Sequence, residues 1–137
     1  MIAAFPDNDI NLELYNRLNN LDVDGTTFKF YVKQVTSEKQ NFYFLKSTQI
    51  SQPSNTKCGT GHITSTEIQV TVILPKNVGS EDLLNKAVAA LYVELEDFNI
   101  PGRSVNNLEL SVDNDLTEEI GGNIVYRKIV RMETTID

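Results

Sequence analysis

His62 is the only histidine in the chain and the side chain with the widest range of possible chemistry. A catalytic histidine needs a nucleophile or a carboxylate held beside it. Thr64 and Ser65 follow it closely, but neighbouring side chains of a strand point to alternate faces and do not converge. We therefore expect His62 to be a surface histidine at the start of a strand, without a catalytic role.

Four acids near the C-terminus have the composition of a calcium-binding loop. They are Asp113, Asp115, Glu118 and Glu119. A calcium loop of this type also needs a glycine at its sixth position and a bidentate glutamate at its twelfth. Counted from Asp113, those positions hold Glu118 and Ile124. The pattern indicates a solvated acidic loop over Asp113–Gly122, with weak cation binding as the alternative.

The remaining motifs do not assemble into a site. Gly59–Gly61 lacks the Gly-Lys-Ser/Thr and the following helix of a phosphate loop. Cys58 is the only cysteine, so no internal disulfide can form, and we interpret it as a loop thiol. Arg127, Lys128 and Arg131 lie among apolar residues of a strand, which favours salt bridges between subunits over nucleic-acid contacts. We expect no catalytic residue, no metal, no cofactor and no enzymatic activity.

The periodic segments predict one α+β domain over residues 1–137. Helical spacing indicates a helix over Asp9–Asn19 and an amphipathic helix over Ser80–Asp97, where Ser80 is a good N-cap and Asp82 can pair with Lys86. Alternation predicts five strands: Thr27–Val35, Asn41–Ile50, His62–Leu74, Leu108–Val112 and Asn123–Ile136. We expect a mostly antiparallel sheet with two helices packed on one face, in the order α-β-β-β-α-β-β.

Three connecting features add to this prediction. The polar segment Thr36–Gln40 fits a hairpin loop between two strands. The long polar segment Ser51–Gly61 is a loop candidate for contacts to another chain. The last strand, Asn123–Ile136, carries apolar residues on both faces, which indicates a bulge or packing against a neighbouring subunit.

Charge and composition limit the possible partners. The net charge is −7, and residues 76–137 hold 12 of the 19 acidic side chains. Such a chain is a poor candidate for direct phosphate binding, which depends on Lys and Arg patches. No apolar run approaches the roughly 18 residues of a membrane span. Met1–Pro6 has no basic region and meets Asp7 too early for a signal peptide, so we expect a protein made in a cytosol.

Three stretches of the chain resemble the tail terminator (tail completion) proteins of long-tailed bacteriophages. They are the helix Ile10–Leu18 leading into the strand Phe28–Val35, the strand Glu67–Leu74 leading into the helix Leu83–Leu95, and the strand Val125–Ile136 after an acidic loop. Together they cover most of the chain. The polar loop Ser51–Gly61 departs from that family's pattern.

The resemblance implies a structural virion protein, made in the bacterial host and placed in the tail or neck. Such proteins form a hexameric ring that ends the tail tube and joins it to head-proximal connector proteins, and DNA passes through the lumen without specific binding. We expect subunit contacts at Tyr126, Arg127, Val130, Arg131 and Met132. We expect lumen or partner contacts at Lys57, Asp113, Asp115, Glu118 and Glu119.

Two other functions remain open from the sequence. Other neck proteins, such as head–tail connectors and stoppers, have overlapping size and composition. A small cytosolic α+β binding module that uses the Ser51–Gly61 loop would also fit the pattern.

Overall fold

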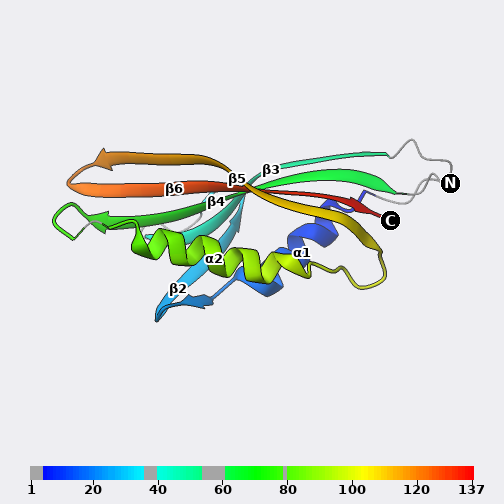
Figure 1. Cartoon of the computed structure of the whole chain (residues 1–137), viewed down its shortest axis with the longest axis horizontal. Helices are drawn as coiled ribbons and strands as arrows, with labels where there is room; N and C mark the ends of the chain where they lie inside the picture. Colours follow the sequence, from blue (N-terminus) through cyan, green and yellow to red (C-terminus); the bar gives the residue numbers. More distant parts are fainter. Residues whose placement is uncertain (1–4, 36–39, 54–60, 79) are drawn as a thin grey trace.

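The computed structural model describes residues 5–35, 40–53, 61–78 and 80–137, and the fold is α+β (Figure 1). In chain order, the elements are α1 (Asp7–Leu18), β1 (Leu21–Val23), β2 (Thr26–Val32), β3 (Phe42–Pro53), β4 (His62–Pro75), α2 (Asp82–Glu96), β5 (Val105–Ile120) and β6 (Asn123–Ile136). Neither helix has the length and apolar character needed to cross a membrane.

The strands form one sheet in the order β1-β2-β3-β4-β6-β5. All neighbours are antiparallel except β2 and β3, which run parallel. The predicted hairpin between those two strands is therefore wrong, and its residues 36–39 lie outside the described residues. Alternation reveals a strand but not its direction, so the sequence pattern did not distinguish the two arrangements.

The chain has one strand more than predicted, because β1 pairs with β2 across Asp24 and Gly25. These two residues have φ of 50° and 84°, and a two-residue hairpin turn of the Asp-Gly kind requires positive φ at both positions. The strand itself has only three residues, which is too short for a periodic pattern.

Both helices cover the same face of the sheet (Figure 1). The predicted apolar stripe of α2 is buried at Leu84, Ala87, Leu91 and Leu95 and partly buried at Val88. The even-numbered residues of β4 from His62 to Val72 point toward the helices and are buried. The helix begins at Asp82 with Glu81 as its N-cap, so the N-cap predicted at Ser80 is wrong, although Ser80 Oγ accepts a hydrogen bond from the Asp82 N–H. The predicted pair of Asp82 with Lys86 is confirmed at 3.1 Å.

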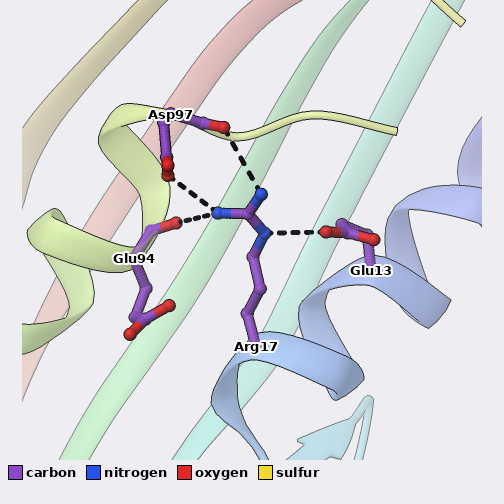
Figure 2. Close-up of polar contacts among 4 residues, drawn as sticks. All are labelled: Glu13, Arg17, Glu94 and Asp97. Carbon is purple, nitrogen blue, oxygen red and sulfur yellow. Dashed lines mark hydrogen bonds and ion pairs between the residues drawn. The ribbon is translucent and has the colours of Figure 1, made fainter. Parts of the chain in front are cut away.

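Arg17 ties α1 to the C-terminal end of α2 (Figure 2). Its guanidinium donates to the Glu13 carboxylate at 2.8 Å, to the Glu94 carbonyl oxygen at 2.7 Å and to the Asp97 carboxylate at 2.9 Å. The guanidinium also lies 5.6 Å from the centre of the Phe98 ring. Arg17 is partly buried, which lowers its pKa, but hydrogen bonds to Glu13 and Asp97 outweigh burial and raise the pKa overall.

The predicted acidic loop is instead the second half of β5. The strand runs from Val105 to Ile120, where the sequence indicated a short strand followed by a loop over Asp113–Gly122. The turn is confined to Gly121 and Gly122, which both have positive φ. The acidic composition is typical of a loop, but β5 is an edge strand, where charged side chains are common and reach solvent.

β6 lies between β4 and β5, and this position explains its apolar residues on both faces. Val125 and Tyr126 point to opposite faces and are both buried. The bulges lie in β5 rather than in β6, at Asn106/Glu109 and at Val112/Asn114. The bulge predicted for β6 is therefore wrong in its position.

Candidate subunit interface

The outer strand β5 leaves a long segment without cover. All side chains described between residues 111 and 120, which we call the β5 flank, are exposed. Three of them are large and apolar: Val112, Leu116 and Ile120 are 46%, 50% and 55% exposed. Single apolar residues on a surface are ordinary, but three along one unpaired edge strand indicate a contact surface.

The bulge at Val112/Asn114 distributes the β5 flank over two faces. Val112 lies opposite Val130 and points to the helix side of the sheet. Leu116 lies opposite Arg127 and points to the face without helices, which we call the helix-free face. One extra residue between them, Asp113, shifts the alternation by one position.

Ion pairs join neighbouring strands on the helix-free face, beside the β5 flank. Arg131 binds Asp113 at 2.6 Å and Glu67 at 3.2 Å, so it joins β5 to β4 across β6. The hydrogen bond to Glu67 and the charge of Asp113 raise the pKa of Arg131. Arg127 binds Glu118 at 2.9 Å. These arginines position β5 within this chain, and whether they also contact a neighbour stays a prediction.

Three of the predicted interface residues lie in the core. Val130 and Met132 are 0% exposed and Tyr126 is buried, all packed among residues of the helix side. The assignment of these three to a subunit contact is wrong, because the helices already cover them. The prediction required the helix side of β6 to be an outer surface of the subunit, whereas the helices cover it.

The predicted acidic cluster is spread along the strand. Asp113 pairs with Arg131, Glu118 pairs with Arg127, and Glu119 pairs with Lys76 at 3.1 Å. Asp115 lies opposite Lys128, on the helix side. The extended backbone thus holds these acids apart on two faces, which is unlike a calcium loop. Lys57, Cys58 and the central part of the Ser51–Gly61 loop lie outside the described residues.

The other edge of the sheet is stepped, because β2 ends at Val32 while β3 continues to Pro53. We call the stepped edge the surface formed by Lys29, Val32, Lys33 and Ile50. Val32 and Ile50 are exposed apolar side chains there, and Lys33 Nζ donates to the Ser47 carbonyl oxygen at 3.5 Å. These residues were not predicted as a contact surface, although two lysines near the end of one strand are a signal in the sequence.

Lys46 and His62 are basic side chains buried on the helix side, and neither was predicted as a core residue. Lys46 of β3 is 2% exposed, and burial lowers its pKa to about 8. The charge of Asp7 opposes this shift, and the charge of Lys33 adds to it. His62 is fully buried against the Phe5 ring, so its assignment to the surface is wrong.

The described residues also form a concave site. A pocket of about 170 Å³ lies between α1 and the segment after α2, with Leu12 and Ile100 in its lining. Its two carboxylates, Asp9 and Glu13, are held in ion pairs with Arg103 and Arg17. No three His, Cys, Asp or Glu side chains gather as a metal site within residues 5–35, 40–53, 61–78 and 80–137.

The most distinctive surface of the described chain is thus a sheet edge and not a pocket. A comparison of the chain with protein-family models and with curated protein sequences finds no match.

Proposed function

We propose that this protein is a non-enzymatic structural subunit that assembles into a closed ring in the tail or neck of a bacteriophage. The observation that carries the proposal is the β5 flank, where an edge strand exposes Val112, Leu116 and Ile120 on both faces of the sheet. An edge strand of this length presents unpaired backbone groups, and natural proteins cover or pair such edges.

Ring geometry gives both sheet edges a role. A closed ring needs two different surfaces on opposite sides of each subunit, so that each copy binds the next in the same way. The described sheet has β5 at one edge and β1 at the other, on opposite sides of one rigid element. This arrangement, together with the resemblance of the chain to tail terminators, favours a ring over a ligand-binding module.

The charge of the chain supports the passage of DNA. Direct binding to phosphate requires clustered Lys and Arg, whereas this chain has a net charge of −7. A ring of such subunits would repel phosphate at short range and let DNA slide through its lumen. Glu118 and Glu119 near the end of the β5–β6 hairpin are candidates for the lumen or for a neck partner.

The test is the mass of the purified protein by light scattering over a series of concentrations, with negative-stain images of any large species. We expect a closed ring of uniform diameter, with a mass that is a fixed multiple of the monomer. Addition of linear duplex DNA should leave the mass unchanged, because the proposal includes no specific DNA binding. A strict monomer at all concentrations would contradict self-assembly of the isolated chain.

A further inference from the structure

We propose that β5 of one copy docks, through the β5 flank and the neighbouring Glu109, on the stepped edge of the next copy, with acids of β5 facing Lys29 and Lys33. This inference rests on the proposed ring and names the two surfaces that close it. The docked partner is a second copy of this chain, and the two edges of the sheet are complementary in charge and in apolar residues.

The β5 edge is acidic from Glu109 to Glu119. The strand from Val105 to Ile120 holds five acids and no Lys or Arg: Glu109, Asp113, Asp115, Glu118 and Glu119. Three of these acids are paired with bases of their own chain. Glu109 and Asp115 are exposed, and neither has an ion-pair partner among the described residues. They are therefore available to bases of another copy.

The stepped edge has the opposite charge. Lys29 Nζ donates to the Asn20 side-chain oxygen at 2.5 Å and Lys33 Nζ donates to a backbone carbonyl, so neither lysine meets a carboxylate in the described part of the chain. Lys33 also lies near enough to Lys46 for its charge to disfavour the ammonium of Lys46. A carboxylate arriving from a neighbour would relieve this repulsion.

The apolar residues match in the same way. Leu116 and Ile120 are exposed on the acidic strand β5, and Val32 and Ile50 are exposed on the two strands of the stepped edge. Docking of one edge on the other would remove all four from water. Two β5 strands paired with each other would instead place acids against acids, which disfavours a symmetric dimer through this strand.

The experiment is a charge exchange between the two edges. One variant carries Glu109→Lys and Asp115→Lys, and the other carries Lys29→Glu and Lys33→Glu. In each variant alone, like charges would meet at every contact between copies. We expect the protein concentration needed for assembly to rise at least about tenfold. Mixed in equal amounts, the two variants alternate and every contact again joins opposite charges, so assembly returns. Light scattering measures the three samples, and far-UV circular dichroism shows that each variant is folded.

Glu96→Lys is the matched control, because Glu96 is an exposed acid at the end of α2 and belongs to neither β5 nor the stepped edge. We expect this variant to assemble as the wild type does. Variants that assemble singly, or a mixture that stays dissociated, would overturn the assignment of the edges while the ring itself stands. A wild-type chain that never assembles would overturn the ring, so the two failures are distinguishable.

Discussion

The guanidinium of Arg17 donates a hydrogen bond to the backbone carbonyl oxygen of Glu94 at 2.7 Å, so a side chain of α1 completes the last turn of α2 (Figure 2). The last carbonyls of a helix lack donors within the helix. We expect Arg17→Ala to lower the free energy of unfolding by about 1–3 kcal/mol, because it removes several charge-assisted hydrogen bonds between the helices. Urea denaturation followed by circular dichroism measures the change.

Lys76→Ala is the comparison for that prediction. Lys76 and its partner Glu119 are both largely exposed, and such surface pairs contribute about 0–1 kcal/mol. Equal effects of the two substitutions would mean that Arg17 is only another surface charge.

A substitution in the core should reduce stability, and a substitution on the β5 flank should reduce assembly. Met132 is fully buried, so Met132→Ala should lower the free energy of unfolding by about 2–5 kcal/mol. Leu116 is half exposed, so Leu116→Ala should change that free energy by less than about 0.5 kcal/mol and should weaken assembly. Unfolding curves and light scattering on both variants measure the two effects. A Met132→Ala protein that is as stable as the wild type but fails to assemble would contradict this assignment. It would mean that the helix side of β6 belongs to the subunit interface.

The sequence predicted the regular elements well where one face is buried. β4 and β6 follow the predicted strands within one residue, because alternation over 14 residues leaves little freedom in the boundaries. The direction of β2 beside β3 and the existence of β1 depend on pairing and on a two-residue turn, which periodicity does not report. Charged composition is common to loops and to exposed edge strands, so the acids of β5 predicted a loop where the structure has a strand.

The candidate interface was harder to predict for a related reason. In β6 both parities carry apolar residues, so the pattern does not reveal which parity the helices cover. Tyr126, Val130 and Met132 turn out to face the helices, whereas Arg127 and Arg131 face away. The lysines of the stepped edge depend on β2 ending earlier than β3, which is a property of the fold and not of either strand alone.

His62 is a buried polar side chain whose effect on the free energy of unfolding can be measured. Its ring is fully buried, and neither ring nitrogen has a hydrogen-bond partner in the described part of the chain. A buried polar group without a partner is costly, so His62→Leu should raise the free energy of unfolding by about 1 kcal/mol. Thermal unfolding at neutral pH measures this change. A clear loss of stability would indicate that the ring nitrogens are hydrogen-bonded in solution.

Lys46 predicts how stability depends on pH. Burial lowers its pKa to about 8 in the folded chain, from 10.5 in the unfolded chain. Between these two values, the unfolded chain holds a proton that the folded chain has released. The free energy of unfolding should therefore rise with pH across this window, by about 2–3 kcal/mol in total. Urea denaturation at about pH 7 and about pH 10 measures the rise.

Lys46→Met separates this effect from the titration of other groups, tyrosines in particular. The thioether fills a similar volume without a charge, so the variant should be more stable than the wild type near neutral pH and should lack the added rise. Lys29→Met, at a partly exposed lysine, should keep the rise. Parallel curves for the wild type and Lys46→Met would mean that the ammonium of Lys46 stays charged when folded. Asp7, whose charge favours the ammonium of Lys46, would then lie closer to it in solution.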